Sequence, residues 1–353
     1  MATTNTWFNS IQGCLLGTAV ADSLGLPFEG MTAQRIQKFN PLPLRHRFFI
    51  KGGMLSDDTE HTCMVAQSLI VSGDDATLFT KQLARRLRWW LVGLPAGIGM
   101  ATLKSLLKLW LGFSPEKSGV WSAGNGPAMR SAIIGVYAAN NNELLTKLVT
   151  QSTLISHSDP KALKGALIVA MLAAENAINE KSDIDNYLAK IKTITDGDEE
   201  LTDLVNKAVT SARKNESAKT FCQQIGFNKE VTGYIYQTLP VVLQIFLRYP
   251  RKYEIAIQEA ILCGGDTDTV AAILGGMVGA GCGAEGIPQH WIDGIIEWPR
   301  SVTWMNELAL RLSKSKTEKQ KPVPLNMVGL LVRNVFFMLW ILAHGFRRLL
   351  PPY

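Results

Sequence analysis

The stretch Gly264 to Val278, which reads GGDTDTVAAILGGMV, decides the fold of this chain. It begins with two glycines, continues with two aspartates separated by a threonine, and ends in a run of small and apolar residues. From Val270 onward the spacing is helical and no residue is charged, which predicts a helix that is buried on most of its surface. Aspartates at the edge of a buried helix repel one another unless a cation neutralises them.

Helical spacing recurs in most other long segments. Apolar residues stand three and four positions apart, with Ala, Leu, Gln and Lys between them, in Leu78 to Leu91, Leu144 to Leu154, Lys161 to Ala177, Leu201 to Arg213 and Ile255 to Leu262. Sustained alternation of apolar and polar residues is rare. Glycines are expected at the joints between helices, at Gly13 and Gly17, Gly52-Gly53, Gly124 and Gly126, Gly264-Gly265, and Gly275-Gly276. The sequence therefore predicts a compact, all-α protein of many helices.

The composition narrows the class of protein. The chain has 353 residues, of which 47% are hydrophobic and 19% are charged, so a large core is available and long disordered stretches are not expected. The formal charge of +6 is concentrated late in the chain, at Arg311, Lys314, Lys316, Lys319 and Lys321, and again at Arg333, Arg347 and Arg348. The remainder is close to neutral, which argues against a nucleic-acid groove.

The cysteines and the N-terminus indicate a compartment. Five scattered cysteines include no CxxC pair, which argues against a disulfide framework or a zinc knuckle; they are Cys14, Cys63, Cys222, Cys263 and Cys282. Buried free thiols are typical of a reducing compartment. No basic segment followed by an apolar run opens the sequence, so no secretory signal is evident. We expect a cytoplasmic protein.

A change in composition near the C-terminus divides the chain. Residues 1–312 are expected to form the main domain, and residues 313–324, which include KSKTEKQK and two prolines, form a basic linker. Residues 325–353 follow as a separate C-terminal segment, strongly apolar over 325–346. Eighteen helical residues would extend about 27 Å, near the thickness of a bilayer's hydrocarbon core.

Arg333 and Asn334 interrupt that apolar segment, and an arginine at the centre of a bilayer costs about 2.5–3.5 kcal/mol on insertion scales. Basic residues flank both ends, so no orientation is preferred. Three interpretations stay open: a membrane anchor, an interfacial helix, and a helix that docks on its own domain or on a partner.

Three acidic motifs carry the chemical signal: Asp22 to Gly30 (DSLGLPFEG), Ser56 to Thr59 (SDDT) and Asp266 to Thr269 (DTDT). One Ser, Thr or Asp at a helix N-terminus is an ordinary cap. Here two clusters of acidic and hydroxyl residues each stand at the start of an apolar helix. Capping alone does not require so many of them. Their hard oxygen atoms suit Mg²⁺ or Mn²⁺ rather than zinc. If the clusters face each other they could hold two ions, orient substrate hydroxyls and activate a water.

Two further motifs precede helical runs. Ser122 to Arg130 (SAGNGPAMR) contains glycines that let backbone N–H groups approach a ligand, and a helix N-terminus attracts phosphate. Gly-Asn-Gly also forms ordinary turns, so this signal is weak alone. Ser156 to Pro160 (SHSDP) reads as a helix entry, and its lone His157 is more often structural than functional.

Taken together and in this order, the motifs resemble the ADP-ribosylglycohydrolase family, which includes the enzyme that reactivates dinitrogenase reductase and the animal ADP-ribosyl-acceptor hydrolases. The resemblance runs from about Trp7 to about Arg300. It rests on Gly13 to Gly17, Asp22 to Glu29, Ser56 to Thr59, Gly124 to Arg130, Ser156 to Asp159, Thr238-Leu239-Pro240, Gly264 to Thr269, and Gly286-Ile287-Pro288 with Trp291.

The resemblance implies a compact all-α domain with two Mg²⁺ or Mn²⁺ ions. Its implied metal ligands are Ser56, Asp57, Asp58, Asp266, Asp268 and Thr269. Catalytic roles are implied for Glu29, Asp58 and Asp268, with Glu29 ligating or lying beside the metals and contacting the scissile ribose. Diphosphate contacts are implied for Ser122, Gly124, Asn125 and Gly126, and His157 would line the ribose–phosphate part of the pocket.

Some positions depart from the family pattern. Ser56 stands where threonine is usual, although its oxygen atoms can still serve as ligands, and Asp22 stands in Ala-Asp-Ser rather than Gly-Asp-Ala. The apolar segment from Leu325 has no counterpart in that pattern.

The implied function is metal-dependent hydrolysis that releases ADP-ribose from a modified protein or small molecule. The metals would hold the 2- and 3-hydroxyls of the distal ribose, and a water activated there, with Glu29 or an aspartate as base, would attack the anomeric carbon.

A non-catalytic ADP-ribose-binding module tethered by its C-terminal segment stays open. Helical isoprenoid synthases also use Asp-rich motifs, but they need Asp-Asp-x-x-Asp, and here His61 takes the last place. A purely structural protein gives no reason for the acidic clusters, and the sequence does not reveal the acceptor.

Overall fold

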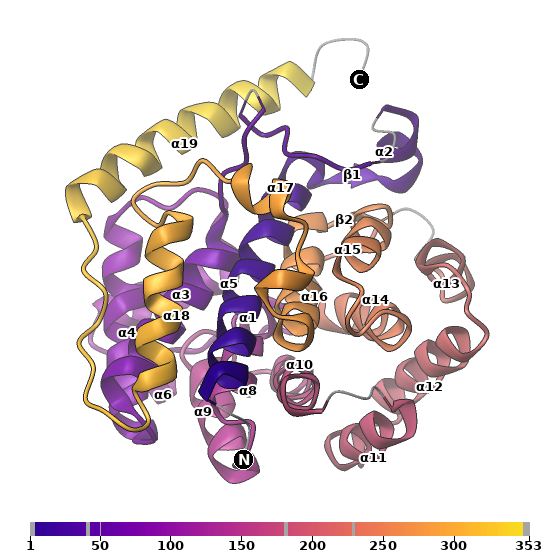
Figure 1. The fold of residues 1–353 in the computed structure, drawn as a ribbon, viewed down its shortest axis with the longest axis horizontal. Coiled ribbons are helices and arrows are strands. Elements are labelled where there is room, and N and C mark those ends of the chain that lie inside the picture. Colours follow the sequence, from indigo (N-terminus) through magenta and orange to yellow (C-terminus); the bar gives the residue numbers. More distant parts are fainter. Residues whose placement is uncertain (1–3, 40–42, 50, 180–182, 228–229, 349–353) are drawn as a thin grey trace.

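The computed structural model describes residues 4–39, 43–49, 51–179, 183–227 and 230–348 (Figure 1). Helices dominate these residues, which confirms the all-α prediction, and the strands β1 and β2 have two residues each. The elements are α1 (Thr4–Gly25), η1 (Leu26–Phe28), β1 (Met31–Thr32), α2 (Ala33–Phe39), α3 (Asp57–Ser72), α4 (Ala76–Val92), α5 (Met100–Trp110), α6 (Pro115–Ser118), α7 (Gly126–Met129), α8 (Ala132–Tyr137), α9 (Asn142–Leu154), α10 (Pro160–Ile178), α11 (Ile184–Thr195), α12 (Glu199–Arg213), α13 (Ala218–Gln224), α14 (Ile235–Arg248), α15 (Tyr253–Ile261), β2 (Gly264–Gly265), α16 (Thr267–Cys282), η2 (Ala284–Gly286), α17 (Gln289–Asp293), α18 (Val302–Lys314) and α19 (Met327–Arg348).

Helices α1 and α16 pack against each other at the centre of the molecule (Figure 1). Their backbones approach so closely that a Cβ atom at Gly17 would lie 2.3 Å from the carbonyl oxygen of Gly275, and the reverse distance is also 2.3 Å. Gly13 and Gly279 form a second contact of the same kind. Glycine is therefore required in the middle of both helices. The expectation that Gly13, Gly17 and Gly275-Gly276 mark joints is wrong. All four lie inside α1 or α16, where close contact between helices and not chain reversal selects them.

The central pair is enclosed by other helices. Helices α3, α4 and α18 lie on one side of it, and α10, α14 and α15 lie on the other (Figure 1). Residues Val270 to Leu274 of α16 are all buried, as are most apolar positions of α14. The prediction that the stretch after Asp268 forms a buried helix is confirmed.

The C-terminal segment forms helix α19, which lies across one end of the domain (Figure 1). Its inner face carries the buried residues Leu330, Arg333, Asn334 and Phe337. The side chain of Asn334 donates to the carbonyl of Gly93 at 2.7 Å. Docking on its own domain, one of the three interpretations of the sequence, is therefore what the structure shows for the inner face.

Arg333 is buried because it has a partner. Its guanidinium pairs with Glu297 at 2.6 Å and donates to the backbone carbonyl of Leu55 at 2.5 Å. The arginine that interrupts the apolar segment is thus a docking residue. The outer face of α19 stays exposed, and among the helices that the structure describes α19 alone is long and apolar enough to cross a membrane.

Candidate active site

The first acidic cluster is held in place by Asp22 of α1. The carboxylate of Asp22 is fully buried and accepts hydrogen bonds from the backbone N–H of Ser56 at 3.0 Å and from the hydroxyl of Thr59 at 2.5 Å. Ser56 is the N-cap of α3 and accepts from the N–H of Asp58. Asp22 therefore fixes the first turn of α3, and that turn carries Asp57 and Asp58.

The second acidic cluster opens helix α16 and meets the first. The hydroxyl of Thr269 donates to Oδ2 of Asp58 at 3.2 Å, and Ser56 donates to the same oxygen at 3.0 Å. The other oxygen of Asp58, Oδ1, is buried and has no hydrogen-bond partner among the residues that the structure describes. The two sequence-distant clusters thus lie side by side.

A small antiparallel sheet brings Glu29 to the second cluster. Strand β1 pairs with β2, and the N–H of Gly30 donates to the carbonyl of Gly265 at 2.8 Å. Gly265 has φ of +86°, and a Cβ atom there would lie 2.1 Å from the carbonyl oxygen of Val231. Only glycine fits this crossing, which brings Glu29 near Asp268, the carboxyl group whose pKa its charge raises.

The Gly-Asn-Gly loop joins the second cluster through Asn125. The amide of Asn125 donates to Asp266 at 2.7 Å and to Thr238 at 3.0 Å. A Cβ atom at Gly124 would lie 3.0 Å from Nε2 of His157. A larger residue at this position would press on the imidazole, which packs directly on the loop.

His157 ends a buried chain of hydrogen bonds. Its Nδ1 lies 2.9 Å from the hydroxyl of Ser156, which accepts from Arg130 at 2.6 Å, and Arg130 also contacts Nδ1 of His61. Burial and the nearby Arg130 charge lower the pKa of His157 to about 3. The imidazole is therefore neutral at physiological pH.

These elements surround a cavity of about 390 Å³, called here the carboxylate pocket. Every site residue predicted from the sequence lines it except Asp58, which lies behind Thr269 and Ser56. The pocket residues with predicted roles are Glu29, Ser56, Asp57, Ser122, Gly124, Asn125, Gly126, His157, Asp266, Asp268 and Thr269.

Sequence reasoning missed the apolar side of this pocket. Phe337 and Ile341 of α19 line it, together with Ala96 and Met100 from the segment before and at the start of α5. The interruption of the C-terminal segment by Arg333 was the signal, because Phe337 and Ile341 continue the face on which that arginine is buried.

The carboxylates of the pocket raise one another's pKa. Burial first, and then the charges of Asp57, Asp22 and Asp266, raise the pKa of Asp58 well above its ordinary value. Burial and the charge of Glu29 do the same for Asp268. Such groups repel in the ionised state unless a cation is present.

The carboxylate and hydroxyl oxygens of the pocket fit hard divalent cations, although they do not surround a single position. Among the residues that the structure describes, no three Asp, Glu, His or Cys side chains converge into a closed ligand set. The unpartnered Oδ1 of Asp58 and the raised carboxylate pKa values nevertheless match what Mg²⁺ or Mn²⁺ binds, since both ions prefer carboxylate and hydroxyl oxygens.

Several proteins are similar to this chain in sequence, and a solved structure is similar to it in fold. An uncharacterized protein of Archaeoglobus fulgidus is 28% identical over 85% of this chain and 95% of its own length. The ADP-ribosylhydrolase ARH3 of Gallus gallus is 25% identical over 79% and 87%. The ADP-ribosyl-[dinitrogen reductase] glycohydrolase of Rhodospirillum rubrum is 23% identical over 80% and 88%. A solved structure titled ADP-ribosylglycohydrolase-related protein complex superposes with a TM-score of 0.66 at 27% identity, covering 89% of this chain and all of that one.

The model of one family matches residues 3–322 and ends before α19. Its description is ADP-ribosylglycohydrolase. The match contains both acidic clusters, Glu29 and the Gly-Asn-Gly loop. The chain belongs to the ADP-ribosylglycohydrolase family and is a glycohydrolase of the ADP-ribosyl-cleaving kind.

Proposed function

We propose that this chain hydrolyses the glycosidic bond between ADP-ribose and an acceptor in the carboxylate pocket, with the help of two divalent cations. The observation that carries the proposal is the contact between the two acidic clusters, where Thr269 donates to Asp58 at 3.2 Å. A pocket of about 390 Å³ next to that contact has the size of a small-molecule site.

The cations are proposed to be Mg²⁺ or Mn²⁺. Their ligands would be Ser56, Asp57, Asp58, Asp266, Asp268 and Thr269. When bound, such ions supply positive charge that orients the hydroxyls of the distal ribose. The unpartnered Oδ1 of Asp58 supports the assignment.

Glu29 is the proposed general base. Its carboxylate borders the pocket and would accept the proton of a water whose oxygen forms the new bond to the anomeric carbon. The bond from that carbon to the acceptor then breaks, and the acceptor leaves with a proton. Asp58 and Asp268 would stabilise the positive charge that develops on the ribose.

The Gly-Asn-Gly loop and His157 are proposed to hold the rest of the ADP-ribosyl group. Ser122, Gly124 and Gly126 line the pocket and leave backbone N–H groups within reach of the diphosphate. The side chain of Asn125 is engaged with Asp266 and Thr238, so its role is to fix the loop. His157 would contact the ribose–phosphate part as a neutral imidazole.

Relatives leave the acceptor open. The names of these relatives differ in the acceptor that they state: ADP-ribosylhydrolase, ADP-ribosyl-[dinitrogen reductase] glycohydrolase and ADP-ribosylarginine hydrolase. The test is a panel of substrates with arginine-linked, serine-linked and O-acetyl ADP-ribose, assayed for free ADP-ribose by mass detection with Mg²⁺, with Mn²⁺ and with EDTA. Release that requires metal supports the proposal. Tight binding of ADP-ribose without release from any substrate would instead favour the non-catalytic binding module.

We also propose that the protein is cytoplasmic and contacts a membrane through residues 325–346. Five free cysteines agree with a reducing compartment. The outer face of α19 exposes Val328, Val332, Leu339 and Phe346 by more than half. No acidic residue follows Glu318, whereas Lys319, Lys321, Arg347 and Arg348 flank the helix. An apolar face between basic ends suits an interface with anionic lipid.

A further inference from the structure

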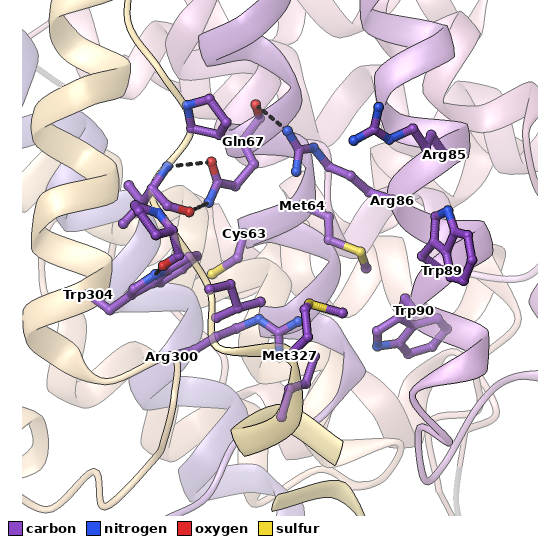
Figure 2. A pocket seen from close by; sticks show the side chains of 15 residues that line it. Cys63, Met64, Gln67, Arg85, Arg86, Trp89, Trp90, Arg300, Trp304 and Met327 are labelled. Atoms are coloured by element: carbon purple, nitrogen blue, oxygen red, sulfur yellow. Dashed lines mark hydrogen bonds between the residues drawn. The ribbon is translucent and has the colours of Figure 1, made fainter. Parts of the chain in front are cut away.

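A second cavity, of about 400 Å³, shares no lining residue with the carboxylate pocket. It lies between α3, α4, α18 and the linker that leads into α19 (Figure 2). We call it the tryptophan cavity. Its lining residues are Cys63, Met64, Gln67, Arg85, Arg86, Trp89, Trp90, Arg300, Trp304, Pro322, Val323, Pro324, Leu325, Met327 and Leu330.

Most of the surface of the tryptophan cavity is apolar. Figure 2 shows Met64 and Met327 facing the cavity from opposite sides, with Trp89 and Trp90 along α4. Leu330 closes the end near α19. Methionine side chains are flexible and adapt to an irregular apolar ligand. The volume lies within the range of about 300–1,000 Å³ that small-molecule sites occupy.

Arg86 brings positive charge into this apolar cavity without a matching carboxylate, and the solvent-exposed Arg85 adds charge at its edge. Arg300 is paired with Glu60 at 2.5 Å, but in the described part of the chain no acidic side chain pairs with Arg85 or Arg86. The guanidinium of Arg86 donates to the backbone carbonyl of Gln67 at 3.3 Å, and its Nε is buried with no partner among the described residues.

The lack of a nearby carboxylate is reflected in the pKa of Arg86. Burial, and then the neighbouring charge of Arg85, lower the pKa of Arg86 to about 10. A cation that is removed from water and lies beside a like charge is unfavourable unless an anion joins it. The geometry of the guanidinium suits a carboxylate, which it can bind through two parallel hydrogen bonds.

We propose that the tryptophan cavity binds an amphiphilic anion, a carboxylate on an unbranched hydrocarbon chain. The carboxylate pairs with Arg86 and Arg85, and the chain lies along Met64, Trp90 and Met327. The ligand class follows from the combination of an apolar wall with the buried, unpartnered Nε of Arg86 and the exposed guanidinium of Arg85 beside it. A nucleotide or a sugar would need polar partners along its whole length, and the cavity supplies them mainly at the arginine end. This site is independent of the proposed hydrolysis.

The probe is dodecanoate, titrated below its micelle concentration into the full chain and followed by calorimetry. Saturable binding of dodecanoate, with dodecanol binding at least about tenfold more weakly, is expected because a charge-assisted hydrogen bond is lost. Arg86→Met should weaken dodecanoate binding by a similar factor. The matched control is Arg88→Met, since Arg88 is on the same helix but stacks on Trp110 at 5.0 Å and does not line the cavity.

A second variant blocks the apolar part. Met327 lines the cavity but is 54% exposed, so Met327→Trp fills space without disturbing the core. We expect it to abolish dodecanoate binding and to leave the melting temperature unchanged. Equal binding of dodecanol, unchanged binding in both Arg86→Met and Met327→Trp, or binding only to phosphatidylglycerol vesicles and not to free dodecanoate would each overturn the proposal.

Discussion

The hydroxyl of Thr269 donates a hydrogen bond of 3.2 Å to the carboxylate of Asp58, a residue 211 positions earlier in the sequence. The bond joins the first turn of α16 to the first turn of α3. Both turns begin with acidic clusters, so the bond fixes the distance between them. Asp58 keeps its second oxygen buried and unpartnered within the described structure. That oxygen is where the proposed cations would compensate the negative charge.

Removing one carboxylate should stop turnover and spare the fold. We expect Asp57→Asn, Asp58→Asn and Asp268→Asn each to lower the rate of ADP-ribose release by at least about 100-fold, the loss found when one electrostatic stabiliser of a transition state is removed. The amide has the same shape, so circular dichroism should be unchanged. Asp203→Asn is the matched control, because Asp203 pairs with Lys207 on the surface. A variant with normal activity would remove its residue from the catalytic set.

The stability of the metal-free protein should depend on pH in a particular direction. Burial and mutual repulsion raise the pKa values of Asp57, Asp58 and Asp268 above the ordinary value of 3.8. The folded state therefore binds more protons than the unfolded state, and its stability falls as the pH rises through the raised pKa values. Above about pH 7.5, one unit above the ordinary histidine pKa of 6.5, the buried imidazoles of His46, His61 and His157 are neutral in both states and do not oppose this trend.

The measurement is the melting temperature in EDTA from about pH 7.5 to about pH 8.5, above the titration of the histidines, repeated with Mg²⁺ and Mn²⁺. The melting temperature should fall with rising pH in EDTA, and each metal should restore it, most at the alkaline end. Asp268→Asn removes one repelling charge, so it should melt higher than the parent chain in EDTA and respond less to metal. A flat profile with no metal response would contradict the proposed cation site.

Much of the site could be predicted from the sequence because its residues stand in short motifs. Carboxylate and hydroxyl side chains are concentrated in two segments of four residues, Ser56 to Thr59 and Asp266 to Thr269. Both segments line or adjoin one pocket. The means of assembly could not be predicted. Strands β1 and β2 have two residues each, which is too short for a period-2 pattern to show in the sequence. Their pairing is nevertheless what brings Glu29 to the second acidic cluster, near Asp268.

The fold class followed from helical spacing, but the meaning of single residues often depended on a distant partner. The sequence around Gly17 does not tell whether the glycine ends a helix or lies inside one. The contact with α16 explains it, because a Cβ atom at Gly17 would lie 2.3 Å from the carbonyl oxygen of Gly275. Arg333 looked out of place in an apolar segment for the same reason, since its partner Glu297 precedes the linker by many residues.

The close contact between α1 and α16 predicts that a methyl group added at one of its glycines destabilises the fold. A Cβ atom at Gly275 would meet the backbone oxygen of Gly17 at 2.3 Å, and backbone cannot move aside as a side chain can. We expect Gly275→Ala to lower the free energy of unfolding by about 1–3 kcal/mol, or more if the helices separate. Gly345→Ala is the matched control, because a Cβ atom there meets nothing within 4 Å in α19. Chemical denaturation measures both, and equal stabilities would contradict the tight helix contact.

The outer face of α19 predicts binding to anionic membranes. We expect the chain to sediment with phosphatidylglycerol vesicles more than with phosphatidylcholine vesicles, and less at high salt, because basic residues flank the helix. Val332→Glu with Leu339→Glu should reduce binding at least about tenfold, since each buried apolar side chain contributes about 1.5–3 kcal/mol. Both residues are exposed, so the fold should persist. Ile255→Glu on α15 is the control, and equal loss in that variant would argue against α19 as the contact.

The ion pair of Arg333 with Glu297 links α19 to the first acidic cluster. Glu297 accepts from the N–H of Leu55 at 3.0 Å, Arg333 donates to the carbonyl of the same residue, and Ser56 follows it in the chain. We expect Arg333→Met to lower the free energy of unfolding by about 3–5 kcal/mol, because Glu297 is left buried without a partner charge.

The same pair provides its own control. Adding Glu297→Gln to Arg333→Met removes the unpaired charge, so the double variant should recover much of the lost stability while α19 stays loosened. Hydrogen exchange at residues 54–58 measures the link directly, and it should be faster in both variants than in the parent chain. Val335→Ala, on the exposed side of α19, should leave it unchanged. If exchange at residues 54–58 does not respond to Arg333→Met, then α19 covers the pocket without supporting the cluster, and Phe337 and Ile341 are its whole contribution.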